Sequence, residues 1–175
     1  PSCAAGTDIP ASGNGFYYAN APTLTLSGLT ANGKTYNRNV NTTLSGTPTA
    51  VGLLGSDTVS IDSSAVTATF ADWNIGVNTA VTVSGYAFTG TKLGYLLSQP
   101  TGLTATIIAK GLTISGVTAN DKIYDRSVTA TLAGAGALVG VESGDAVNLT
   151  GTASAIFADW NIGAGKAVTV TGYTI

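Results

Sequence analysis

Apolar residues alternate with Thr and Ser in five segments of the chain, at residues 24–29, 58–61, 66–70, 80–84 and 103–107. A period of two puts alternate side chains on opposite faces, which is typical of a half-buried β-strand. Turn-forming residues such as Asn32-Gly33 and Gly55-Ser56-Asp57 separate these segments. No segment has a convincing helical period. The pattern therefore predicts an all-β protein built from short strands.

The chain contains an internal repeat. The segment "LTLSGLTANGKTYNRNVNTTLSG" from Leu24 returns 88 positions later, from Leu112, as "LTISGVTANDKIYDRSVTATLAG". Further along, "FADWNIGVNTAVTVSGY" from Phe70 returns 87 positions later, from Phe157, as "FADWNIGAGKAVTVTGY". The chain thus carries two copies of one design, with a single deletion between the two matched blocks.

We expect three parts: an N-terminal arm at residues 1–23, a first β repeat at 24–109 and a second β repeat at 110–175. The second repeat has no counterpart of residues 89–107, so it is expected to be incomplete at its C-terminal side. Strand signals at intervals of about 8 to 12 residues predict two tandem immunoglobulin-like antiparallel β-sandwiches, the second lacking its last strand. A β-grasp-like arrangement is the alternative, because it has much the same alternation.

A sandwich without its last strand should expose an apolar groove and unpaired main-chain groups. An extended segment from another molecule can fill such a groove by strand addition. The N-terminal arm has a suitable pattern, and its candidate donor residues are Phe16, Tyr17, Tyr18, Leu24 and Leu26. A head-to-tail contact of this kind does not close on itself, so it predicts a filament.

The composition removes most enzymatic chemistry. The 175 residues include no His, no Met and one Cys, and only 9% are charged, with 7 Lys and Arg against 9 Asp and Glu. We therefore expect no enzyme, no cofactor, no metal and no nucleic-acid partner. No apolar run reaches the roughly 18 residues of a membrane span. The polar start lacks the features of a signal peptide, so the sequence is interpreted as a mature or excised piece.

Two motifs occur in both copies. In the first, Lys, Tyr and Arg alternate and should share one face of a strand, where they either protect a strand edge by charge or contact a neighbouring unit. In the second, a Trp beside a Gly turn either caps its own sandwich or stacks on a sugar or a neighbouring subunit. The residues are Lys34, Tyr36, Arg38 and Trp73 in the first copy and Lys122, Tyr124, Arg126 and Trp160 in the second.

Together with "YLLSQPTGLTATI" from Tyr95, these motifs resemble the YDG-type repeats of large bacterial secreted adhesins, including filamentous-haemagglutinin-like proteins. The resemblance covers residues 24 to 175 and implies a surface-exposed or released β-rich stalk or fibre without catalytic residues. The chain departs from that repeat type where Tyr-Asp-Gly is usual, because it has Tyr36-Asn37-Arg38 and Tyr124-Asp125-Arg126. An Arg must therefore accommodate a turn that Gly would relax. Each repeat also has a Trp where a polar residue is more common.

The resulting expectation is a structural subunit or segment of an extracellular bacterial fibre or adhesin that associates with itself head to tail by β-strand complementation. Its partners would be further copies, or neighbouring repeats of a longer chain. The alternative is a carbohydrate- or surface-binding module of a long single-chain adhesin, with host or surface glycans as ligands. Both place the chain outside the cell, at the bacterial surface.

Overall fold

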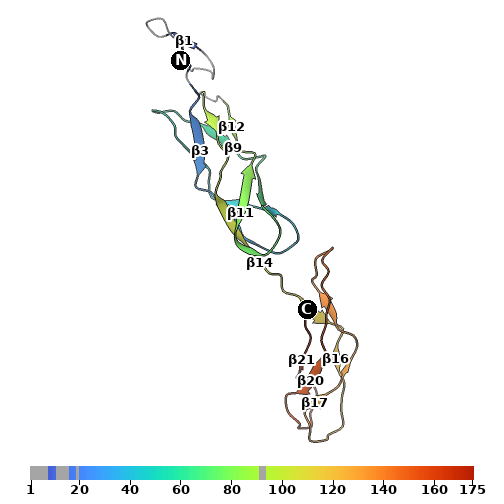
Figure 1. Ribbon diagram of the computed structural model, residues 1–175. Helices are drawn as coiled ribbons and strands as arrows, with labels where there is room; N and C mark the ends of the chain where they lie inside the picture. Colours follow the sequence, from blue (N-terminus) through green and yellow to red (C-terminus); the bar gives the residue numbers. More distant parts are fainter. Residues whose placement is uncertain (1–7, 11–15, 19, 91–93) are drawn as a thin grey trace. The chain divides into compact units, whose positions relative to one another are not determined.

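A computed structural model describes residues 8–10, 16–18, 20–90 and 94–175. Every regular element in this part of the chain is a β-strand (Figure 1). The predicted all-β class is confirmed, and the packed sheets are consistent with a β-sandwich. The immunoglobulin-like strand order stays a prediction. The chain divides into two compact units, unit 1 at Pro1–Ala109 and unit 2 at Lys110–Ile175.

The main sheet of unit 1 has five strands. In order across the sheet they are β5 (Lys34–Thr35), β14 (Leu103–Ile108), β11 (Gly76–Ser84), β10 (Thr67–Phe70) and β6 (Asn41–Thr42). The β14 strand runs antiparallel to β11 on one side and parallel to β5 on the other. The last strand of the unit therefore lies inside the sheet, with both of its edges paired.

Smaller sheets complete unit 1. One has the order β13 (Leu96–Leu97), β3 (Thr23–Ser27), β8 (Thr49–Val51), and two ribbons pair β4 (Thr30–Ala31) with β7 (Leu44–Ser45) and β12 (Ala87–Thr89) with β9 (Ser60–Asp62). The β13–β3 pairing is also parallel, which differs from the expected purely antiparallel arrangement. The strand expected over residues 24–29 is interrupted at Gly28, where the chain turns with a φ of 82°.

The core of unit 1 lies on one face of the main sheet. Alternate residues point inward, as a period of two requires. The buried cluster comprises Ala68, Phe70, Val81, Val83, Tyr86, Ala105 and Ile107. Two of these residues, Ala105 and Ile107, come from β14, and only 2% of Ile107 is exposed. The last strand thus supplies both main-chain pairing and apolar side chains.

Unit 2 repeats this plan in part. It pairs β15 (Thr113–Ser115) with β19 (Ala137–Val139) and β16 (Thr118–Ala119) with β18 (Leu132–Ala133), and its largest sheet is β17 (Thr129–Ala130), β20 (Ser154–Phe157), β21 (Val168–Thr171). When the repeat offset of 88 or 87 is subtracted from its residue numbers, each of these strands coincides with a strand of unit 1. The described part of unit 2 has no strand equivalent to β13 or β14.

Side chains at matching positions are buried to different extents in the two units. Val83 in β11 is 4% exposed, whereas its counterpart Val170 in β21 is 39% exposed. Phe70 is buried in unit 1, and its counterpart Phe157 is only half-buried. In unit 1, β14 lies beside β11 in the same sheet and adds Ala105 and Ile107 to the core that contains Phe70 and Val83. The described part of unit 2 has no such strand.

The N-terminal arm contains an antiparallel pair, β1 (Asp8–Pro10) with β2 (Phe16–Tyr18). The donor candidates Phe16, Tyr17 and Tyr18 form β2, and their side chains lie outside the described part, as does Cys3. The other two donor candidates lie in β3 of unit 1. Leu24 is completely buried there and Leu26 packs against the core, so unit 1 already uses both side chains.

We expect Gly85→Ala to destabilise unit 1 by about 3 kcal/mol, because Gly85 has a φ of 95° and a Cβ there would lie 2.1 Å from the Ala65 carbonyl oxygen. The matched control is Gly90→Ala, where φ is 73° and nothing lies within 4 Å of the added Cβ. That change should cost only about 1 kcal/mol. Urea unfolding followed by Trp73 fluorescence, in a chain carrying Trp160→Phe, measures both. Equal losses of stability in the two variants would show that the Ala65 carbonyl oxygen does not cause the effect at Gly85.

Candidate functional site

The residues that surround β14 in unit 1 have counterparts in unit 2. Ile107 lies opposite Gly76 of β11 and opposite Lys34 of β5. Beyond β5, the Tyr36 N–H donates to the Ile108 carbonyl at 2.8 Å. The β14 strand is therefore held along both edges, and its inward side chains fill the space above Phe70.

Unit 2 has a groove at the equivalent place. It is a cavity of about 650 Å³, and its lining includes Lys122, Tyr124, Phe157, Gly163 and Val168. These residues match Lys34, Tyr36, Gly76, Val81 and Phe70, which surround β14 in unit 1. Within the described part of unit 2, no strand pairs with residues 122–124 or with the outer edge of β21. The cavity therefore lies among the counterparts of the residues that surround β14 in unit 1.

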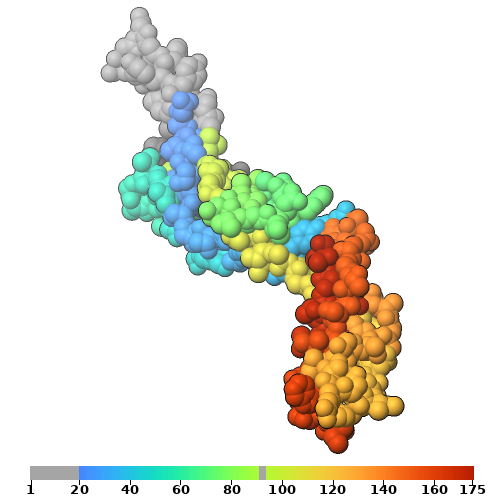
Figure 2. Space-filling model, turned by 60° about the horizontal axis from the view of Figure 1, so that its bottom comes forward, coloured from blue at the N-terminus to red at the C-terminus, as the bar shows by residue number. Residues whose placement is uncertain are grey.

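Apolar side chains around this groove are largely exposed. The exposed fractions are 91% for Ile123, 52% for Tyr124, 59% for Trp160 and 86% for Ile162. In the space-filling view, the red C-terminal segment and the orange-yellow segment around residues 115–130 both lie at the surface of unit 2 (Figure 2). Exposed apolar groups beside unpaired strand edges favour contact with a further extended chain.

A lysine ammonium fixes the loop that follows the Lys-x-Tyr-x-Arg motif. Lys122 Nζ donates to the carbonyls of Ser127 at 2.7 Å and Thr129 at 3.2 Å. It also pairs with the Asp125 carboxylate at 2.7 Å, which lowers the pKa of Asp125. The ammonium lies 6.0 Å from the centroid of the Phe157 ring. The lysine therefore ties the loop to the floor of the groove.

Unit 1 has the same arrangement. Lys34 Nζ donates to the carbonyls of Asn39 and Asn41, the latter at 3.0 Å, and lies 5.6 Å from the Phe70 ring centroid. Partial burial lowers the pKa of Lys34. Lys34 and Lys122 thus use their charge within their own loops.

The expectation that Lys, Tyr and Arg share one face of a strand is wrong. In unit 1 the strand ends at Thr35, and Arg38 has a φ of 54°. In unit 2 residues 122–126 form no strand, and Arg126 has a φ of 58°. The left-handed conformation falls at the third position of Tyr-Asp-Gly, so Arg does adopt the turn that Gly would relax, as the sequence predicted.

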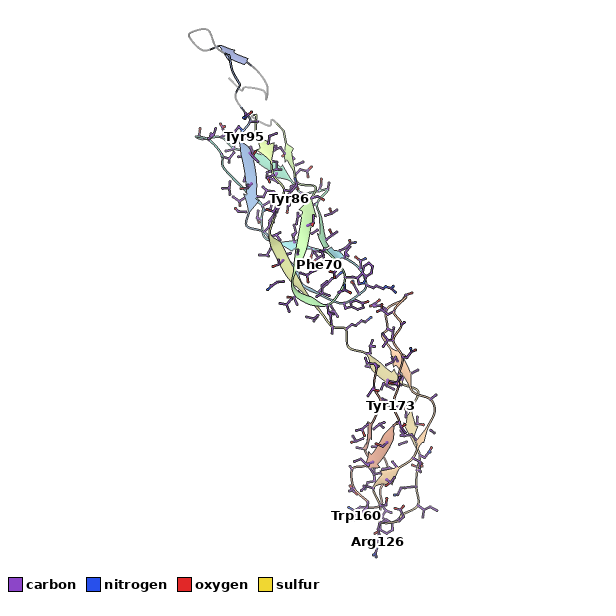
Figure 3. The ribbon with its side chains drawn as sticks, in the orientation of Figure 1. Phe70, Tyr86, Tyr95, Arg126, Trp160 and Tyr173 are labelled. Atoms are coloured by element: carbon purple, nitrogen blue, oxygen red, sulfur yellow. The ribbon has the colours of Figure 1, made fainter. Side chains whose placement is uncertain are left out.

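The Trp motif forms a second loop at the groove. The Asp159 carboxylate accepts the Asn161 N–H at 2.7 Å, as Asp72 does from Asn74 in unit 1. An ion pair with Lys166 lowers the pKa of Asp159. The exposed fraction is 45% for Trp73 and 59% for Trp160, so neither indole is enclosed by its own unit. Trp160 and Arg126 lie at the same end of unit 2, whereas Tyr173 lies farther along it (Figure 3).

Two side chains that hold the last segment of unit 1 were missed by sequence reasoning. The Tyr95 hydroxyl donates to Asp57 Oδ2 at 2.7 Å, and the Gln99 carboxamide bonds both main-chain groups of Tyr86. Comparison of the two copies could not find Tyr95 and Gln99, because neither has a counterpart in the second copy. The residues that they contact, Asp57 and Tyr86, do have counterparts in the second copy, which are Asp145 and Tyr173.

Other kinds of site find little support among the described residues. They contain no group of three or more His, Cys, Asp or Glu side chains placed to hold a metal ion. They also contain no helix long and apolar enough to cross a membrane.

We expect Arg126→Gly to stabilise unit 2 by about 1 kcal/mol, because it removes the steric cost of a side chain at a φ of 58°. Arg126→Ala is the matched control and should give no gain, because Ala keeps the Cβ that causes the strain. Urea unfolding followed by Trp160 fluorescence, in a chain carrying Trp73→Phe, measures both. A gain with Ala equal to that with Gly would show that φ is not the cause.

Comparison with known proteins agrees with the internal repeat. The family model described as YDG domain matches residues 20–102 and 108–175, which is most of the chain. No curated protein and no solved structure matches the chain. The first match lies within unit 1, and the second covers all of unit 2 and the two residues before it. The chain therefore belongs to the YDG domain family.

Proposed function

We propose that the chain is a structural segment of an extracellular bacterial fibre or adhesin, and that its units associate head to tail by β-strand complementation. One observation carries the proposal: the groove of unit 2 has the position and the lining that surround β14 in unit 1. An incoming strand takes this place and pairs with β21 on one side and with residues 122–124 on the other. The resemblance to secreted adhesin repeats supports a location outside the cell.

Strand addition is favourable here for two reasons. The first is main-chain pairing, because an added strand satisfies exposed N–H and C=O groups at two edges. The second is burial of apolar side chains. In unit 1 the inward Ile107 is 2% exposed, and burying an Ile side chain contributes about 1.5–3 kcal/mol. A comparable side chain would cover Phe157 and Val168 in unit 2.

The donor is the N-terminal arm of a second copy. The β2 strand, Phe16–Tyr18, precedes Leu24 by the same spacing that separates residues 104–106 of β14 from Leu112, the counterpart of Leu24 in the second copy. A joint between two molecules would therefore reproduce the joint between β14 and unit 2 within one chain. In the groove the donor is paired on both edges, so β2 must first separate from β1.

The contact joins different surfaces of the two molecules, so repetition gives a filament rather than a closed ring. A single-chain adhesin is the close variant of this proposal. There the groove is filled by a further segment of the same polypeptide, and the chemistry of the joint is the same. Neither version requires a cofactor or a catalytic residue.

Electron microscopy and sedimentation of the full chain, beside a chain lacking residues 1–20, test the proposal. The truncation leaves Pro22, whose carbonyl accepts a hydrogen bond from the Leu96 N–H at 3.0 Å. We expect filaments or larger oligomers of the full chain, and monomers of the truncated chain, because only the full chain has a donor. Equal association of both would show that the arm is not the donor. If both stay monomeric at every concentration, self-association is excluded.

A second candidate function is carbohydrate binding, and it rests on the composition of the same groove. Tyr124 and Trp160 present exposed rings beside the polar groups of Asp159, Asn161 and Lys166. Aromatic rings with nearby polar groups are typical of sugar sites. A strand that fills the groove would compete with such a ligand.

Retention on immobilised bacterial and host polysaccharides tests this second function. Carbohydrate binding at the groove predicts that Trp160→Ala removes retention, because the stacking surface is lost, while Trp73→Ala in unit 1 keeps it. Absence of retention of the unaltered chain on every polysaccharide would contradict the second function. It would leave strand complementation unaffected.

A further inference from the structure

We infer that unit 1 has a binding site for an uncharged saccharide, in a cavity that is lined by residues of both β8 and β9. The cavity has a volume of about 480 Å³. Pockets that bind small molecules usually have volumes of about 300–1,000 Å³. All of its lining residues belong to unit 1, so the site is separate from the groove of unit 2 and does not depend on strand complementation.

The lining of this cavity has a polar part and an apolar part. The side chains that carry hydroxyls are exposed, and they are Thr47, Thr49, Thr58 and Ser63. The apolar side chains are half-buried, and they are Pro48, Ala50, Leu53, Val59 and Ile61. None of the described residues that line the cavity is charged. This lining suits an uncharged ligand that has hydroxyl groups on one side and C–H groups on the other, as a saccharide has.

The four hydroxyls of the lining make no hydrogen bond to another described residue. Elsewhere in the chain, Ser and Thr hydroxyls bond each other across strands, as Thr67 does with Ser84 at 2.9 Å and Ser154 with Thr171 at 3.0 Å. A hydroxyl can donate one hydrogen bond and accept two. The cavity therefore offers several donors and acceptors to the hydroxyls of a ligand.

The loop that contributes Leu53 and Thr58 to the lining is held in place by Tyr95. The Tyr95 hydroxyl accepts the Leu54 N–H at 2.9 Å and donates to Asp57 Oδ2 at 2.7 Å. The Tyr95 side chain is 5% exposed, so it is a fixed support. This part of the lining is thus ordered before a ligand arrives, which lowers the entropic cost of binding.

Two carboxylates lie next to lining residues in the chain. Asp57 precedes Thr58, and Asp62 follows Ile61. Asp62 accepts the Ser64 N–H at 2.8 Å, which lowers the pKa of Asp62, so this carboxyl is ionised at neutral pH. Negative charge beside the cavity disfavours an anionic ligand. The class of ligand is therefore a neutral saccharide rather than an acidic one.

The matching positions of unit 2 lack these hydroxyls. The repeat offset of 88 still applies there, because Thr150, which is bridged to Thr174, matches Asp62, which is paired with Ala87. The counterparts of Thr47, Thr49 and Thr58 are Ala135, Ala137 and Ala146. Since Ala serves at all three positions of a folded unit, the fold does not require the three hydroxyls of unit 1.

Unit 2 also has less room at this place. The counterpart of Pro48 is Gly136, and a Cβ on Gly136 would lie 2.9 Å from Leu149 Cδ2 and 3.0 Å from the Tyr173 hydroxyl oxygen. These two side chains therefore occupy the space beside Gly136. The units differ here in both room and polarity, so we expect one saccharide site in the chain, in unit 1.

Saturation-transfer difference NMR of the full chain with small sugars tests the site. The neutral probes are maltose, cellobiose, lactose and N,N′-diacetylchitobiose, and the anionic probe is sialyllactose. We expect transfer to at least one neutral sugar at millimolar concentration and none to sialyllactose, because of the carboxylates beside the cavity. Absence of transfer to every neutral sugar would overturn the inference. Stronger transfer to sialyllactose than to the neutral sugars would overturn the assigned class of ligand.

Removal of single hydroxyls tests their role. Thr49→Val and Thr58→Val keep the shape of the side chain, and each should weaken the affinity for the bound sugar about tenfold, because a hydrogen bond to the ligand is lost. The matched control is Thr82→Val, which removes an exposed hydroxyl of β11 outside the cavity and should leave the affinity unchanged. Equal affinities of all three variants and the unaltered chain would overturn the role of the hydroxyls.

The position of the bound sugar separates this site from the groove of unit 2. We expect the sugar to shift the amide NMR signals of Thr49 and Thr58 and to leave the indole N–H signal of Trp160 unchanged. A shift of the Trp160 signal alone would place the sugar in the groove and overturn the inference. Thr58→Val should not change the oligomeric state of the chain, so failure of the saccharide site and failure of strand complementation are seen in different measurements.

Discussion

A strand in a sheet needs a partner for its main chain, and this requirement organises both units. In unit 1 it is met by β14, which is the last strand of that unit along the chain and lies between β11 and β5. The same strand brings Ala105 and Ile107 into the core, so main-chain pairing and apolar burial are satisfied together. Unit 2 has the neighbours of such a strand without the strand itself. Val170 is 39% exposed in unit 2, and the groove lies among the counterparts of the residues that surround β14.

Much of the fold could be predicted from the sequence, because its causes are local. The alternation of apolar residues with Thr and Ser located the strand over residues 80–84, which the structure extends back to Gly76. The repeat offset predicted matching strands in the second copy. The Arg at the third position of Tyr-Asp-Gly indicated an unusual turn, and the positive φ of Arg38 and Arg126 confirms it.

What could not be predicted depends on contacts between residues far apart in the sequence. The parallel pairing of β14 with β5 joins residues 107 and 34, and no local pattern specifies it. The hydroxyl of Tyr95 meets Asp57 across 38 positions, and only the folded chain brings them together. For Lys34, Tyr36 and Arg38 the period-two pattern was misleading, because the strand ends at Thr35 and the chain turns at Arg38, where φ is 54°.

The position of β14 also bears on how unit 1 would respond to force. The start of β3 and the end of β14 lie at opposite ends of the unit (Figure 1). Tension applied through the chain would therefore pull β14 along its own axis, against β11 on one edge and β5 on the other. Under this shear the hydrogen bonds of both ladders share the load and must fail together. A hairpin pulled apart at its open end would instead lose its bonds one at a time, at much lower tension.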